Sequence, residues 1–124
     1  MKFFSELLKI LEELLDIESN DITEETYLIR DLGAESIDLL ELSVAINNKF
    51  KIDVIDDDIF LIKFREYLFN SEKDNLDKIT FFLKKYPFQT KTRIKEILND
   101  IDNGPALKIK DVINYIKWKY TNES

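Results

Sequence analysis

The sequence predicts an all-α protein, and two observations support that prediction. Apolar residues recur at helical spacing in several separate segments, and breakers such as Pro87 and residues 103–105 divide these segments. The alternation expected of a half-buried strand is limited to a brief stretch at residues 52–54. With 124 residues, 44% of them hydrophobic, the chain is long enough for one packed domain spanning residues 1–124.

The first half of the chain predicts two helices joined by a long loop. Residues 2–15 are amphipathic and predict the first helix. Residues 16–35 have no sustained periodicity and predict a loop held to the core by scattered apolar residues. These are Ile17, Ile22, Leu28, Ile29 and Leu32. Residues 36–50 predict a helix that is apolar over much of its circumference, so we expect it to be mostly buried or to line a cavity.

The second half predicts four shorter helices. We expect them at residues 57–69, 74–86, 90–101 and 108–120. Asp74 or Asn75 is a candidate cap for the second of these, and Pro87 ends it because proline disfavours a helical residue before it. The Asn103–Pro105 breaker ends the third.

The composition narrows the possible functions. The chain has no cysteine and no histidine, which removes disulfides, thiolate zinc sites, cysteine nucleophiles and histidine-dependent catalysis. Residues 1–60 hold 16 Asp and Glu against 5 Lys and Arg, a balance that repels nucleic acid and suits partners with basic patches. No segment has the ~20 apolar residues of a membrane span, and no secretory signal is recognisable. We therefore expect a soluble, cytoplasmic monomer.

Ser36 stands at the start of the helix expected at 36–50, within the stretch DLGAESIDLLEL. A serine at a helix start commonly accepts a backbone N–H bond as a cap. A hydroxyl at the same place is also suited to carry a phosphate, because backbone amides and the helix dipole stabilise negative charge there. Gly33 would permit a tight turn that leaves Ser36 exposed.

The stretch from Asp31 to Asp38 resembles the signature of the acyl carrier protein family. That signature is Asp-Leu-Gly, then Ala or Gly, an acidic residue, Ser, an aliphatic residue and often Asp. The resemblance covers roughly the first sixty residues and returns near the end in LKIKDVINYI. It implies an acyl-carrier-type helical bundle with about two to three additional helices inserted before the C-terminal helix, at about residues 61–105.

The resemblance also implies a function. Ser36 would carry 4'-phosphopantetheine from coenzyme A, added by a phosphopantetheinyl transferase, and the thiol of this arm would hold an acyl chain as a thioester for fatty acid, lipid or polyketide-type biosynthesis. A thiol borrowed from a cofactor explains how a chain without Cys or His takes part in acyl chemistry. The expected partner-binding residues beside Ser36 are Glu35, Ile37, Asp38 and Glu41, facing acyl-transferring or acyl-elongating enzymes with basic patches. The protein would not itself be an enzyme.

Two alternatives stay open beside this reading. The chain could be an unmodified interaction module that keeps the carrier fold. It could also carry an aminoacyl group, although it lacks the His-Ser pair common in peptidyl carriers.

The sequence departs from the family pattern in two places. Asn47, Asn48 and Lys49 stand where further acidic residues are common, which favours a specialised set of partners. The extra segment at 61–105 is rich in aromatic residues and carries Lys84, Lys85, Lys91, Arg93 and Lys95. It could bury its own apolar faces, extend the cavity for a long acyl chain, or dock one enzyme; binding of single-stranded nucleic acid is disfavoured in so acidic a protein.

A group of aspartates at Asp53, Asp56, Asp57 and Asp58 could suggest a metal site. It lacks the ligand spacing, the glycine and the distant Glu of a calcium loop. We therefore expect a solvated loop and no metal.

Overall fold

The structure, a computed structural model, describes residues 2–74 and 76–123, and its regular secondary structure there is helical. The only β pairing there is one isolated antiparallel bridge between Tyr27 and Lys108. The helices are α1 (Phe3–Leu15), α2 (Ser36–Phe50), α3 (Asp56–Ile59), α4 (Phe64–Lys73), α5 (Lys78–Lys85), α6 (Lys91–Asp100), the 3-10 turn η1 (Ile101–Asn103) and α7 (Ile109–Glu123). The prediction of an all-α bundle with additional helices before the last one is confirmed.

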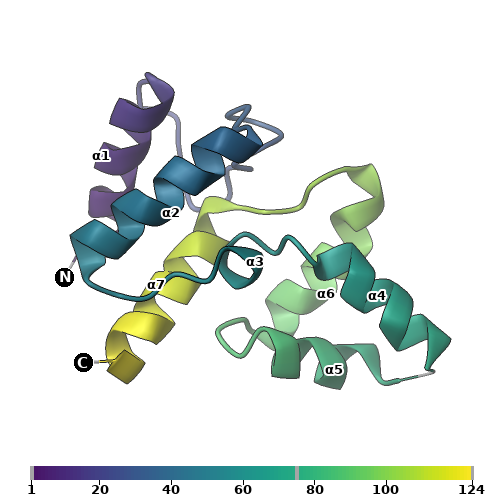
Figure 1. The fold of residues 1–124 in the computed structure, drawn as a ribbon. Helices are drawn as coiled ribbons and strands as arrows, with labels where there is room; N and C mark the ends of the chain where they lie inside the picture. The colour runs from purple at the N-terminus through teal and green to yellow at the C-terminus, as the bar shows by residue number, and fades with distance from the viewer. Residues whose placement is uncertain (1, 75, 124) are drawn as a thin grey trace.

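The helices form two groups (Figure 1). On one side, α1 packs against α2 and α7, and the short α3 packs against α2 and α7. The apolar stripes of these helices meet in a core that includes the fully buried Leu7, Leu11, Ile46 and Ile116. This group is the carrier-like part of the chain.

On the other side, α4, α5 and α6 pack in sequence (Figure 1). Their shared core is a stack of aromatic rings, in which the Phe64 and Phe82 ring centroids are 4.3 Å apart and those of Phe64 and Tyr86 are 6.0 Å apart. All three rings are buried. Most aromatic residues of the extra segment thus serve its own packing, whereas Phe69 is 66% exposed.

A buried ion pair joins the two groups. Arg93 of α6 donates from Nε to Asp111 Oδ1 of α7 at 2.7 Å and from Nη2 to Asp111 Oδ2 at 2.8 Å. The same guanidinium donates to the Ala106 carbonyl, and the Gln89 side-chain amide donates to Asp111 Oδ1. Arg93 is therefore a structural residue that no partner can reach, unlike the exposed Lys84, Lys85, Lys91 and Lys95.

Two predicted helices begin or break elsewhere than expected. The helix expected at 57–69 is interrupted because Leu61 has a left-handed backbone (φ 55°). The helix expected at 74–86 begins at Lys78 with Asp77 at its N-cap position, while Asp74 stands at the C-cap position of α4. The other candidate cap, Asn75, lies outside the described residues.

Candidate functional site: the start of helix α2

The loop before Ser36 is fixed by the segment that leads into α7. The Leu28 N–H donates to the Leu107 carbonyl at 3.1 Å, and the Ile109 N–H donates to the Thr26 carbonyl at 2.9 Å. Leu28 and Leu107 are both buried. The expectation of a long loop held to the core is confirmed, and backbone pairing with the C-terminal segment is what holds it.

Arg30 and Asp100 form a second connection, between this loop and the end of α6. The Arg30 Nη1 donates to both carboxylate oxygens of Asp100, at 3.0 and 3.1 Å, and Nη2 donates to the Asp100 and Gly104 carbonyls. The Tyr27 hydroxyl donates to Asp100 Oδ2 at 2.5 Å. This hydroxyl and the Arg30 guanidinium lower the pKa of Asp100 to about 2, and the nearby carboxylate raises the pKa of Tyr27. Sequence analysis did not identify this pair, because its members lie seventy residues apart.

Gly33 turns the chain toward α2. Its backbone is left-handed (φ 70°), and its N–H donates to the Ile29 carbonyl. A Cβ at this position would meet no atom within 4 Å, so the requirement for glycine is conformational rather than one of space. The prediction of a tight turn at Gly33 is confirmed.

Ser36 is the first residue of α2 and is exposed. The N-cap position belongs to Glu35, whose backbone N–H donates to Asp38 Oδ2 at 2.8 Å. The Ser36 hydroxyl makes no hydrogen bond with the described residues, so the reading of Ser36 as the helix cap is wrong. Its hydroxyl is therefore free and stands at the positive end of a 15-residue helix.

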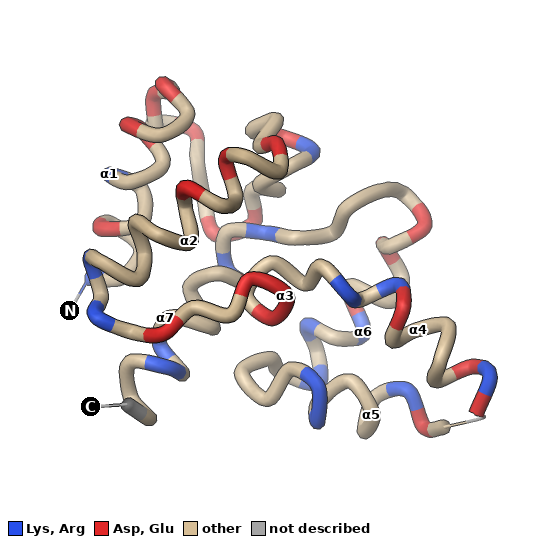
Figure 2. Tube along the Cα trace, viewed as in Figure 1, with Lys and Arg blue, Asp and Glu red and all other residues tan. Residues whose placement is uncertain are grey.

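The expected partner-binding residues surround this hydroxyl. Glu35, Ile37 and Glu41 are exposed, and Asp38 is half-buried because it closes the start of the helix. Figure 2 shows acidic positions along α2 and basic positions along α5 and α6. The first turns of α2 thus present a hydroxyl among carboxylates.

Helix α2 is less buried than its composition suggested. Leu42, Ile46 and Phe50 face the core, but Ile37, Leu40 and Val44 are 57%, 56% and 60% exposed. Helix α2 is not mostly buried, because α1, α3 and α7 cover only one side of it, but the alternative that it lines a cavity holds at Leu39. Three apolar side chains at helical spacing next to Ser36 form an uncovered stripe, which we call the α2 stripe.

Two of the residues at the end of α2 that depart from the family pattern have structural roles. Asn47 donates from its side-chain amide to the Ile52 carbonyl at 2.6 Å, which supports the turn after the helix. Lys49 Nζ lies 3.0 Å from Glu6 Oε2 of α1, and this ion pair lowers the pKa of Glu6. Asn48 is exposed.

The aspartates after α2 are engaged within the protein. Asp56 accepts a bond from the Ser43 hydroxyl at 2.6 Å, and Asp57 lies 3.4 Å from Lys63 Nζ. Burial and the neighbouring Asp57 raise the pKa of Asp58. Across residues 2–74 and 76–123, no grouping of three or more acidic side chains could hold a metal ion.

Comparisons with known proteins agree with this geometry. The family model described as "PP-binding: Phosphopantetheine attachment site" matches residues 5–63. The acyl carrier protein of Wolinella succinogenes is 33% identical over 58 residues, which are 47% of this chain and 76% of that protein. The acyl carrier protein of Trieres chinensis is 46% identical over 54 residues, covering 44% of this chain and 68% of the relative. The chain belongs to the acyl carrier protein family.

The similarity to known carriers covers about half of the chain. The acyl carrier protein of Helicobacter pylori is 33% identical over 57 residues, 46% of this chain and 73% of the relative. No solved structure gives a significant match to the chain. The matched family region ends at residue 63, so α4, α5 and α6 lie outside it. Among the described helices, none is both long and apolar enough to cross a membrane.

The family assigns 4'-phosphopantetheine to this carrier as its prosthetic group. Ser36 fits the attachment of such a group, because its hydroxyl is exposed and has no hydrogen-bond partner among the described residues. It stands at a helix start, where the helix dipole favours a phosphate, although the Glu35 side chain already accepts from the Asp38 N–H. When bound, the arm supplies a thiol that holds an acyl group as a thioester. The nearby carboxylates of Glu35 and Asp38 weaken this fit slightly by charge repulsion with the phosphate.

Proposed function

We propose that this protein carries an acyl chain on a 4'-phosphopantetheine arm attached to Ser36. The observation that carries the proposal is the position of Ser36: a free, exposed hydroxyl at the first residue of α2, inside the matched family region. Attachment would join Ser36 Oγ to the phosphorus of the arm. Adenosine 3',5'-bisphosphate leaves coenzyme A in that step, and the hydroxyl proton passes to the transferase.

The partner surface in this proposal consists of the α2 stripe and the carboxylates beside it. An exposed apolar stripe bordered by Glu35 and Glu41 suits enzymes that combine an apolar contact with a basic patch. Such a surface would serve the phosphopantetheinyl transferase and the enzymes that load, extend or remove the acyl chain. The protein itself only presents the chain, so it catalyses no step.

The family favours a pathway that uses acyl thioesters. Fatty acid, lipid or polyketide-type biosynthesis all use acyl groups held as thioesters. The absence of further acids after Glu41 on α2, where Asn47 and Lys49 instead hold local structure, supports a specialised set of partners. A cytoplasmic location and a monomeric state belong to the same proposal.

Intact-mass spectrometry tests the attachment site. After incubation with coenzyme A and a broad-specificity phosphopantetheinyl transferase, we expect the protein to gain the mass of one arm, and Ser36→Ala to gain none. Ser5→Ala, which removes an exposed hydroxyl from α1, is the matched control and should be modified like the wild type. Failure of the wild type to gain mass with several transferases would favour an unmodified interaction module with the carrier fold.

The same assay tests the partner surface. Glu41→Lys should slow modification by about tenfold, because the surface charge next to the attachment site steers association with a basic enzyme. Glu66→Lys on α4 makes the same charge change away from α2 and should leave the rate unchanged. Equal rates for both variants would remove Glu41 from the proposed surface.

A further inference from the structure

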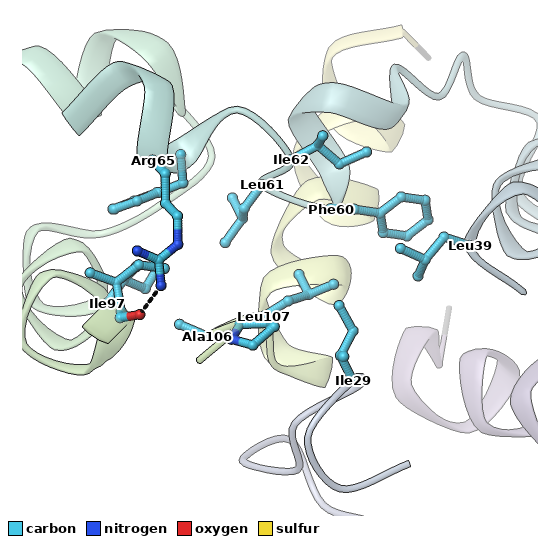
Figure 3. Close-up of a pocket in the computed structure, with 12 residues that line it drawn as sticks. Ile29, Leu39, Phe60, Leu61, Ile62, Arg65, Ile97, Ala106 and Leu107 are labelled. Carbon is cyan, nitrogen blue, oxygen red and sulfur yellow. Dashed lines mark hydrogen bonds between the residues drawn. The ribbon is translucent and has the colours of Figure 1, made fainter. Parts of the chain in front are cut away.

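A cavity of about 240 Å³ lies between the carrier-like part and the extra segment. Ile29, Leu39 and Phe60 line it from the carrier-like part, and Ile97 and Arg65 line it from α6 and α4 (Figure 3). Leu61, Ala106 and Leu107 lie between these two walls (Figure 3). Neither group of helices forms this cavity alone.

The lining is apolar except at one end. Leu39 and Arg65 stand at opposite ends of the cavity in Figure 3, and apolar side chains, Phe60 among them, occupy the space between them. Among the described residues that line the cavity, Arg65 alone is charged, and its Nη2 donates to the Ile101 carbonyl at 2.5 Å. An apolar ligand in this cavity would therefore lie along an apolar wall and meet the guanidinium of Arg65 at the far end.

The Leu39 end lies next to the attachment site. Leu39 is three residues after Ser36 in α2, so both side chains project from neighbouring positions on one side of the helix. A chain tethered at Ser36 can therefore enter the cavity past Leu39. Ile62, which is 55% exposed, also borders the cavity.

The volume of the cavity limits the chain it can hold. An apolar cavity of about 150 Å³ accommodates benzene, which has six carbons. By the same proportion, about 240 Å³ accommodates roughly eight to ten carbons of an unbranched chain. A longer alkyl chain would press its end against the Arg65 guanidinium, whose desolvation opposes binding.

We propose that the extra segment completes an acyl-binding cavity for medium-length, unbranched chains, and that Arg65 sets the far limit of that cavity. This inference rests on the proposed attachment at Ser36. The carrier-like part supplies the near wall, α4 and α6 supply the far wall, and the extra segment thereby selects the cargo. Seven of the twelve lining residues lie outside the matched family region, so this selection is particular to this chain.

The test compares melting temperatures of the protein loaded with saturated chains of four to fourteen carbons from the matching acyl-coenzyme A compounds. Relative to the form with the unacylated arm, we expect the melting temperature to rise by roughly 3–6 °C for each two carbons added and to level off beyond about ten. Arg65→Met should let the rise continue to twelve and fourteen carbons. Ala106→Leu, which fills the cavity, should remove most of the gain at ten carbons.

Two further variants test the cavity even if Ala106→Leu fails to fold. Ile62→Ser alters an exposed residue of the lining, so it should fold even if Ala106→Leu does not, and it should reduce the gain at ten carbons by about half. Phe69→Ser removes another exposed apolar side chain, 66% exposed, that is not among the residues lining the cavity, and its gain should match the wild type.

The outcomes separate this inference from the proposed function. Intact-mass spectrometry after loading shows whether Ser36 carries the acyl arm, and no added mass would overturn the proposed function itself. Loading without any dependence on chain length would overturn only the cavity proposal. A gain that rises undiminished to fourteen carbons in the wild type, or that Arg65→Met leaves unchanged, would contradict the role of Arg65.

Discussion

At the scale of single residues, Asp100 connects the extra segment to the loop that positions Ser36. Its carboxylate accepts hydrogen bonds from the Tyr27 hydroxyl and the Arg30 guanidinium, and its side chain is 21% exposed. These bonds favour the charged form and lower its pKa to about 2. A carboxyl whose pKa is depressed in the folded protein stabilises it above the ordinary pKa near 4, and this contribution is lost as the pH falls toward 2.

Asp100→Asn should therefore destabilise the protein in a pH-dependent way. We expect a loss of about 1–2 kcal/mol in the free energy of unfolding at pH 7, because the ion pair with Arg30 is lost. The loss is no larger because partial exposure to solvent weakens that ion pair. The difference between wild type and variant should shrink as the pH falls from about 4 to about 2. Urea unfolding across this range measures it. Asp102→Asn, at an exposed carboxylate without a hydrogen bond to the described residues, is the control; a difference that stays constant down to pH 2 contradicts the assignment.

At the scale of secondary structure, the ends of α2 show how the chain positions its functional face. The N-terminal end is closed by Glu35 and Asp38, which leaves the Ser36 hydroxyl unused. The C-terminal end is closed by Lys51, which has a left-handed backbone (φ 57°) and whose N–H donates to the Asn47 carbonyl. A lysine in this conformation is sterically strained, whereas a glycine would not be.

Lys51→Gly should stabilise the protein. Relief of the left-handed strain, about 1–2 kcal/mol, exceeds the entropy cost of a new glycine, so we expect a net gain of about 0.5–1 kcal/mol. Chemical denaturation monitored by circular dichroism measures it. Lys9→Gly, at an exposed position inside α1, should instead cost about 1 kcal/mol. If both substitutions destabilise the protein equally, the conformation of Lys51 is not the source of strain.

At the scale of the whole molecule, the sequence predicted most of what is local and little of what depends on distant contacts. Helix α2 begins and ends where its pattern predicts, and the glycine turn before Ser36 is also local. The break at Leu61 was not predictable from periodicity, because the apolar pattern continues through it. The exposure of Leu40 and Val44 depends on which neighbours cover α2, and the Arg30–Asp100 pair joins residues far apart in sequence.

Several contacts unite the carrier-like part with the extra segment. Among them are the buried Arg93–Asp111 pair, the Arg30–Asp100 pair, and the packing of Phe88 against Tyr115 and Trp118, with ring centroids 5.1 and 5.9 Å apart. Removing one member of a buried pair typically costs about 3–5 kcal/mol, so separating the two parts would require a large free energy. We therefore expect residues 1–124 to unfold as one domain.

Coincident unfolding curves would establish this single domain. Trp118 is the only tryptophan, and its fluorescence reports on the contact between the two parts, whereas far-ultraviolet circular dichroism reports on all helices. We expect both signals to change at one denaturant midpoint, because the junction and the helices are lost together. Arg93→Met should lower both midpoints equally, and Lys95→Met, at an exposed lysine of the same helix, should leave them unchanged. A fluorescence change that precedes the loss of helical signal would show that the extra segment separates first and forms a domain of its own.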